Sequence, residues 1–238
     1  MTSAFVCHLY DTFAYQTQKL SRWDFIAKQT ADAFAAKGLP FLNCFGLLDG
    51  KLYGTTRPGD PDIENAAFSG YKRRHGQTYQ AFVAACGLHI GWFGPGEGTN
   101  HTDSWHYANE DLHGQIHRGA AAAAALHGAG PWCIFSDGAY PHSAKLQKGY
   151  MGNLTADERR FNSRCNKTRV AVEWDFHGQV AQFPFVDTAR KQLMQLSPVA
   201  LNVHAALVFH NWWVCCYGGQ LCGYFQAEPP TLARYFQV

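Results

Sequence analysis

The chain has 238 residues, of which 47% are hydrophobic, 15% aromatic and only 16% charged, a composition that excludes a disordered polypeptide. This length is sufficient for one sizeable hydrophobic core. The formal net charge is +2, so overall charge does not indicate nucleic-acid binding, and any contact with a polyanion must come from local basic clusters.

The cysteines and histidines do not indicate a zinc site or a disulfide framework. None of the eight cysteines forms a Cys-x-x-Cys pair, and most lie within apolar runs, where a thiol behaves as a small hydrophobic group. His113 and His117 have the i, i+4 spacing of a helical metal-binding pair, but no third or fourth ligand lies near them in the sequence. We therefore expect free thiols and no metal at this histidine pair.

The sequence shows no signal for export. The first residues lack the charged region and the cleavage site of a signal peptide. Residues 199–217 are apolar enough to be considered as a membrane span, but histidine and asparagine side chains interrupt them, which favours a buried helix. An intracellular, reduced protein without membrane association is expected.

The first third of the chain is predicted to contain a helix followed by a buried strand. Residues 22–37 have the periodicity of an amphipathic helix, which Gly38 ends. Residues 44–49 form an apolar run that closes at Asp49 and indicates a buried strand. Residues 51–56 are compatible with a continuation of this strand, before a segment rich in proline and glycine breaks the pattern.

The middle of the chain alternates strands and helices. Residues 77–85 and 88–93 are predicted to form a hairpin, followed by a glycine-rich loop at 94–98. The alanine run at 120–125 favours a helix, and the apolar run at 132–136 favours another buried strand. This order of elements predicts an α/β fold in which helices cover a central sheet.

Residues 156–182 give the clearest helical pattern in the chain. An apolar stripe runs beside a polar stripe, and Glu173 belongs to the polar stripe, at the border of the buried face. Asp175 points about 200° away from Glu173 by helix geometry and is the weaker candidate for a site. A last long helix is expected at about 198–216, followed by a packed aromatic tail. The apolar stripe consists of Phe161, Cys165, Val172 and Phe176, and the polar stripe of Asn162, Asn166, Arg169 and Glu173.

Three acidic residues are the strongest functional signal. Asp49 and Asp137 each close a predicted strand and precede a glycine, and Glu173 lies on the clearest helix. Taken singly, an Asp-Gly pair is also ordinary turn chemistry. Together, carboxylates at two strand ends and on one helix are what a two-metal phosphodiester site requires, because Mg²⁺ prefers oxygen ligands and keeps several waters.

Two basic clusters flank these acids in the sequence. Lys72, Arg73 and Arg74 precede the second predicted strand, and residues 145–169 carry seven basic residues against two acidic ones. Most such clusters are solvated faces, but their position beside the acids favours contacts with a phosphate backbone. Arg169, one turn before Glu173, suits either a phosphate contact or an ion pair with Glu173.

The motifs around the three acids resemble those of PIF/Harbinger-type transposases, a group of DDE superfamily endonucleases. The segments Leu48-Asp49-Gly50-Lys51 and Ser136-Asp137-Gly138-Ala139-Tyr140-Pro141 are similar to the first and second acidic motifs of that family. Arg169 followed by Val172-Glu173-Trp174-Asp175-Phe176 is similar to the third. The resemblance extends over about residues 38–236 and includes His210-Asn211 near the C-terminus.

The resemblance implies a ribonuclease H-like fold with a mixed central sheet flanked by helices. It implies that Asp49, Asp137 and Glu173 are catalytic and hold a divalent metal, Mg²⁺ or Mn²⁺, for cleavage or transfer of phosphodiester bonds in DNA. Lys72, Arg73, Arg74 and Arg169 are the candidate phosphate contacts. A separate Myb-like DNA-binding partner, oligomerisation and a nuclear location are further expectations.

The domain organisation follows from the same resemblance. Residues 1–40 are expected to form an N-terminal helical segment that is shortened relative to the family, and residues 41–238 the catalytic domain with a C-terminal helical tail. The loop that ends in Asp103-Ser104 is one residue longer than the usual form, so the resemblance assigns Asp103 no definite role.

Two other functions remain open at this point. A transposase-derived DNA-binding or scaffold protein without turnover is favoured by the near-neutral charge and the short N-terminal segment, but an inactive site does not require three acids. A metal phosphatase for small molecules is disfavoured, because the glycines at 94–98 do not match a phosphate-binding P-loop.

Overall fold

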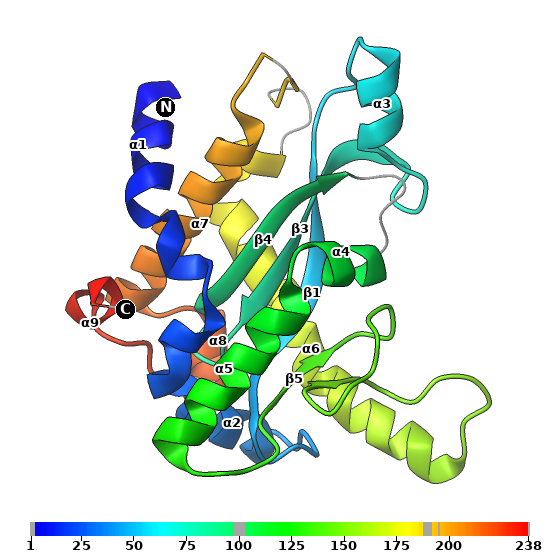
Figure 1. The fold of residues 1–238 in the computed structure, drawn as a ribbon, viewed down its shortest axis with the longest axis vertical. Coiled ribbons are helices and arrows are strands. Elements are labelled where there is room, and N and C mark those ends of the chain that lie inside the picture. Colours follow the sequence, from blue (N-terminus) through cyan, green and yellow to red (C-terminus); the bar gives the residue numbers. More distant parts are fainter. Residues whose placement is uncertain (1–2, 98–102, 188–191, 195, 238) are drawn as a thin grey trace.

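The computed structural model describes residues 3–97, 103–187, 192–194 and 196–237, and its centre is a mixed β-sheet (Figure 1). Within these residues the sheet has six strands in the order β2-β3-β1-β5-β6, and β4 also pairs with β3. β1 is antiparallel to β3 and parallel to β5, and β5 is parallel to β6. The strands are β1 (Cys44–Gly54), β2 (Phe68–Ser69), β3 (Arg74–Val83), β4 (His89–Glu97), β5 (Cys133–Ser136) and β6 (Leu146–Gln147).

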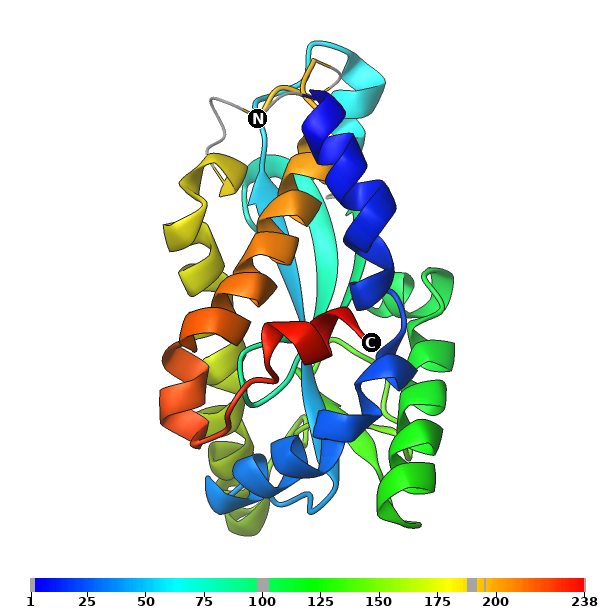
Figure 2. The ribbon, with the colours of Figure 1, turned by 90° about the vertical axis from the view of Figure 1, so that its left-hand side faces the viewer.

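Helices cover both faces of this sheet. The two views together show α5 on one face and α6 on the other, with α7 along the β4 side (Figures 1 and 2). The N-terminal helix α1 packs on α7, and α2 packs on β1 and α5. The described helices are α1 (Ser3–Phe13), α2 (Asp24–Ala36), α3 (Pro61–Ala67), α4 (Asp103–Asn109), α5 (Leu112–His127), α6 (Ala156–Gln182), α7 (Val199–Tyr217), α8 (Gln220–Phe225) and α9 (Leu232–Phe236). This is the mixed α/β architecture that the resemblance implied, and it is consistent with a ribonuclease H-like fold.

The longest helix, α6, begins where its sequence predicts. The Thr155 hydroxyl accepts a hydrogen bond from the Glu158 backbone N–H at 3.3 Å, and the Glu158 carboxylate accepts one from the Thr155 backbone N–H at 2.7 Å. This capping box satisfies two backbone donors that would otherwise lack partners at the helix start. The predicted range 156–182 is confirmed, and all four residues of the polar stripe line one cavity, which is described below.

Strand pairing decides one boundary that the sequence left open and one that it predicted wrongly. β1 does not end at Asp49 but continues to Gly54, as the pattern of residues 51–56 allowed, because β3 stays paired with it as far as Gly76. The glycine-rich segment 94–97 is not a loop but the end of β4, since Gly96 and Glu97 pair with Thr78 and Gln77 of β3. Gly98 lies outside the described residues.

The helix α7 is long and apolar enough to cross a membrane by length and composition alone, but 56% of its most apolar window is buried within the protein. The Asn211 side chain of α7 attaches this helix to the sheet. The Asn211 side chain accepts a hydrogen bond from the His89 backbone N–H and donates one to the His89 carbonyl, both at 3.0 Å. Since both partners are buried, this amide joins α7 to the first residue of β4.

We predict that Asn211→Ala lowers the free energy of unfolding by at least about 2 kcal/mol, because it leaves a buried backbone N–H and a buried carbonyl without partners. Urea denaturation followed by circular dichroism measures this change. The matched control is Asn202→Ala, on the same helix but partly exposed, which is expected to change stability by less than about 0.5 kcal/mol. Equal effects of the two substitutions would contradict a special role for Asn211.

Candidate functional site

The two predicted aspartates lie side by side because of the register between β1 and β5. These strands are parallel, and Leu48 and Ser136 are direct partners at the end of their pairing. Asp49 is the next residue of β1 and Asp137 is the first residue after β5, so the two lie at the same level of the sheet. One carboxylate oxygen of Asp49 accepts from the Gly50 N–H, and one of Asp137 accepts from the Ala139 N–H, each at 2.9 Å. Each carboxylate therefore keeps one oxygen that these turn contacts do not use.

The proximity of like charges changes the acidity of Asp49. Burial, followed by the negative charge of Asp137, raises the pKa of Asp49 from 3.8 to about 7. The positive charge of Arg169 and the hydrogen bond from Gly50 oppose this rise, and Asp103 adds to it. A carboxyl group with this pKa is half-ionised at neutral pH, so a bound cation would favour its charged form.

Glu173 reaches the same cavity from α6. The cavity has a volume of about 1070 Å³, and Asp49, Asp137 and Glu173 all line it. The Arg169 guanidinium lies 3.0 Å from the Glu173 carboxylate and 3.9 Å from the Asp49 carboxylate. Arg169 thus neutralises two of the acids, which confirms the ion pair with Glu173 that the sequence left open. The side chain of Glu173 is 54% exposed, so it lies at the open rim and is not buried with Asp49.

Asp103 is a fourth acid at this site, and sequence analysis gave it no definite role. Its carboxylate accepts a hydrogen bond from the Gln80 side chain at 3.0 Å and lies over Gly50. A Cβ atom at position 50 would lie only 2.5 Å from the Asp103 carboxylate oxygen, so this approach requires glycine there. Burial raises the pKa of Asp103, and the charge of Asp137 raises it further, although the Gln80 hydrogen bond opposes both. The signal in the sequence was the Asp103-Ser104 pair of the family resemblance.

The Gln80 side chain fixes this part of the site. Its amide group donates to Asp103 and its carbonyl oxygen accepts from the Tyr140 hydroxyl, and both Gln80 and Tyr140 are fully buried. Tyr140 belongs to the turn that follows Asp137. Gln80 therefore connects the turn after the second acid to the acid that begins α4.

The four predicted phosphate contacts divide into two groups. Lys72 and Arg169 line the cavity. Arg73 and Arg74 are not among its lining residues, and Arg74 is bound to Asp187 at 3.3 Å and to the Leu52 carbonyl at 2.8 Å. Lys51, which sequence analysis did not propose, lines the cavity instead. Burial lowers the pKa of Lys51, and Asp187, at 3.9 Å, opposes this effect.

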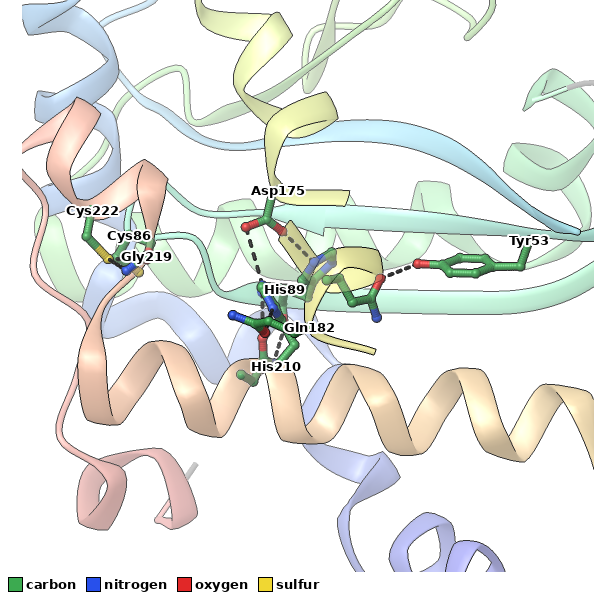
Figure 3. A network of polar contacts seen from close by, with 10 residues as sticks. Tyr53, Cys86, His89, Asp175, Gln182, His210, Gly219 and Cys222 are labelled. Carbon is green, nitrogen blue, oxygen red and sulfur yellow. Dashed lines mark hydrogen bonds and ion pairs between the residues drawn. The ribbon is translucent and has the colours of Figure 1, made fainter. Parts of the chain in front are cut away.

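Asp175 lies apart from this cavity, as helix geometry predicted. It is buried on another side of α6, with its carboxylate between the imidazoles of His89 and His210 (Figure 3). Within the described residues these three form a group with the spacing of metal ligands, whereas His113 and His117 are in no such group.

The carboxylates of the cavity suit a hard divalent cation. They provide oxygen ligands, they face solvent on one side, and their mutual repulsion is relieved when a cation binds between them. The residues that would hold such a cation here are Asp49, Asp137 and, at the rim, Glu173. The donor set therefore fits the metal that the resemblance implied.

Comparison with known proteins identifies the family. No curated protein and no solved structure matches the chain. A family model described as DDE superfamily endonuclease matches residues 48–211, well over half of the chain. The match begins one residue before Asp49, includes Asp137 and Glu173, and ends at Asn211, so it contains every residue that lines the acidic cavity. On this basis the chain belongs to the DDE superfamily endonucleases.

Proposed function

We propose that this protein is a PIF/Harbinger-type transposase domain that cleaves or transfers phosphodiester bonds in DNA with Mg²⁺ or Mn²⁺. The observation that carries the proposal is the adjacency of Asp49 and Asp137 at the edge of a cavity that Glu173 also lines. Membership of the endonuclease family supports nuclease chemistry in general, and the three acidic motifs support this subtype.

The roles of the residues follow from their positions. Asp49 and Asp137 are the inner metal ligands, and Glu173 closes the site from α6. Bound metal ions in such sites activate the attacking oxygen and stabilise the leaving oxygen at phosphorus. A cation between the acids would replace Arg169 as their counter-charge, so Arg169 becomes available for a DNA phosphate. Lys51 and Lys72 line the same cavity and are suited to hold neighbouring phosphates.

Other expectations remain proposals. We propose a nuclear location, work with a separate Myb-like DNA-binding partner, and a domain boundary near residue 40. These rest on the subtype resemblance. α2 packs on β1 within one hydrophobic core, so the proposed boundary near residue 40 divides two segments of the sequence that share that core.

A second candidate function is a DNA-binding scaffold without turnover. One observation favours it: Arg169 bridges Asp49 and Glu173 and so satisfies these acids without a metal. Calorimetric titration with Mg²⁺ and Mn²⁺ separates the candidates. Saturable binding that Asp137→Asn removes supports the nuclease, and no binding at millimolar metal supports the scaffold.

We predict that Asp137→Asn reduces Mg²⁺-dependent nicking of plasmid DNA to the background rate without metal, because one inner ligand is lost. Its circular dichroism spectrum should remain that of the unaltered protein. The matched control is Asp32→Asn on α2, an exposed aspartate paired with Lys28, which should leave nicking unchanged. Nicking by Asp137→Asn at the unaltered rate would refute the assignment.

We predict that metal binding strengthens with pH because Asp49 must be ionised to bind. With a pKa near 7, the affinity for Mg²⁺ should rise about fivefold between pH 6 and 7, by about a further twofold between pH 7 and 8, and level off above pH 8. Calorimetric titrations at pH 6, 7 and 8 measure this. A flat profile would contradict the role of Asp49.

The same pKa gives a prediction for stability without metal. Because the folded-state pKa is raised above 3.8, the folded protein retains this proton longer than the unfolded chain, and stability falls as pH rises from about 4 to 7. Asp49→Asn removes this effect. It should raise the free energy of unfolding at pH 8 by on the order of 2 kcal/mol and change it little at pH 4, by urea denaturation in EDTA. Equal stability of the two proteins at pH 8 would show that Asp49 is not strained by burial and repulsion.

A further inference from the structure

A second cluster of ligating side chains lies in the core, away from the acidic cavity. His89 is the first residue of β4, Asp175 belongs to α6 and His210 to α7. Their side chains are 0%, 5% and 4% exposed. One ligating atom from each lies within 4.8 Å of the other two. None of the three lines the cavity of about 1070 Å³.

The two imidazoles approach opposite oxygens of one carboxylate (Figure 3). His89 Nε2 lies 2.5 Å from Asp175 Oδ2, and His210 Nε2 lies 3.4 Å from Asp175 Oδ1. Despite these short separations, His89 Nε2, His210 Nε2 and Asp175 Oδ2 have no hydrogen-bond partner of adequate geometry among the described residues. Buried polar atoms are rarely left in this state, because each unpaired group costs about 1–3 kcal/mol. The three atoms converge as ion-pair partners, at 2.5 and 3.4 Å, whose hydrogen-bond geometry is incomplete.

The surroundings orient the His210 ring and hold the backbone of His89 in place. His210 Nδ1 lies 3.0 Å from the Gln182 side-chain oxygen. An amide oxygen only accepts, so Nδ1 carries the proton and Nε2 presents its lone pair to the cluster. Metal-binding histidines are oriented by contacts of this kind on the second ring nitrogen. The backbone of His89 is fixed by two hydrogen bonds with the Asn211 side chain, one donated by the His89 N–H and one accepted by the His89 carbonyl, and Asn211 is the residue after His210.

The donor atoms of the cluster suit a transition metal. Two imidazole nitrogens and one carboxylate oxygen form an N/O ligand set. Such a set binds transition metals such as Zn²⁺ in preference to Mg²⁺.

We propose that His89, Asp175 and His210 bind one structural Zn²⁺ ion, separate from the divalent metals of the acidic cavity. Three protein ligands leave one position of a tetrahedral site for water. Zinc bonds of about 2.0–2.2 Å place ligand atoms about 3.4 Å apart, which matches the separation of His210 from Asp175. The closer contact of His89 with Asp175 must open by about 1 Å to admit the ion.

The position of this site gives it a structural role. Its ligands join β4, α6 and α7, three elements that are far apart along the chain. Asp175 is two residues from Glu173 on α6, so a metal at Asp175 fixes the rotation of the helix that carries the third acid of the cavity. The proposal itself does not require that the cavity be catalytic.

The test is the zinc content of the full chain. After dialysis against EDTA and titration with Zn²⁺, the unaltered protein should bind one equivalent, by inductively coupled plasma mass spectrometry, and its Tm should rise. Asp175→Asn should bind less than a tenth of an equivalent. Asp137→Asn should keep the zinc although it loses Mg²⁺-dependent nicking, so the two proposals fail separately. The matched histidine control is His204→Gln, a buried residue of α7 outside the cluster, which should also keep the zinc.

If Asp175→Asn does not fold, X-ray absorption spectroscopy of the unaltered zinc-loaded protein identifies the atoms that bind the zinc. Two imidazole ligands and one or two oxygens at about 2.0 Å are expected. An all-oxygen environment, or loss of zinc in Asp137→Asn and not in Asp175→Asn, would place the ion in the acidic cavity and overturn the proposal. Absence of binding at micromolar Zn²⁺ would also overturn it, and would identify the cluster as an internal ion pair.

Discussion

The parallel pairing of β1 with β5 is the constraint on which the acidic site depends. It brings Asp49 and Asp137 to the same level at the point where β5 ends and β1 continues alone beside β3. Two neighbouring carboxylates, one of them largely buried, oppose folding, and the raised pKa of Asp49 expresses that opposition. The chain tolerates the arrangement because Arg169 supplies a counter-charge from α6. A site that is electrostatically unfavourable when empty is one that gains most from a bound cation.

Helix α6 serves two sites on different sides of its axis. Glu173 and Arg169 lie at the cavity, and Asp175 lies in the core against His89 and His210. A rotation of the helix that improved one set of contacts would disturb the other. The buried cluster therefore restricts the rotation of α6 and with it the orientation of Glu173. At the cavity itself, the partly exposed Glu173 side chain is held by its ion pair with Arg169.

Sequence patterns were sufficient to predict those elements that are determined by residues close together in the chain. The range of α6 was predictable because its capping box and its two stripes all lie within 28 residues, Thr155 to Gln182. The apolar strand cores were predictable for the same reason. The continuation of β1 beyond Asp49 was left open by the local pattern, and the strand at 94–97 was missed, because both depend on pairing with β3, which no local sequence pattern reveals.

The candidate sites divide in the same way. The convergence of Asp49, Asp137 and Glu173 on one cavity was inferred from a motif order that belongs to a family, and the contribution of Lys51 and the contacts of Asp103 were not. The cluster of His89, Asp175 and His210 had no signal, because its members are separated by 86 and 35 residues and none has the spacing of a metal motif. Only the docking of α7 on β4 brings these side chains together.

The two clusters differ in the properties that govern metal selectivity. The cavity offers oxygen ligands, an open rim and room for water and phosphate, which suits a cation that keeps part of its hydration shell. The core cluster offers two nitrogens and a carboxylate, with no more than 5% of any of the three side chains exposed, which suits an ion that sheds most of its water. Because the two clusters differ in ligand type and hydration, they would prefer different cations. The net charge of +2 gives little information about function, because the charged side chains form local pairs and clusters whose charges largely cancel over the whole molecule.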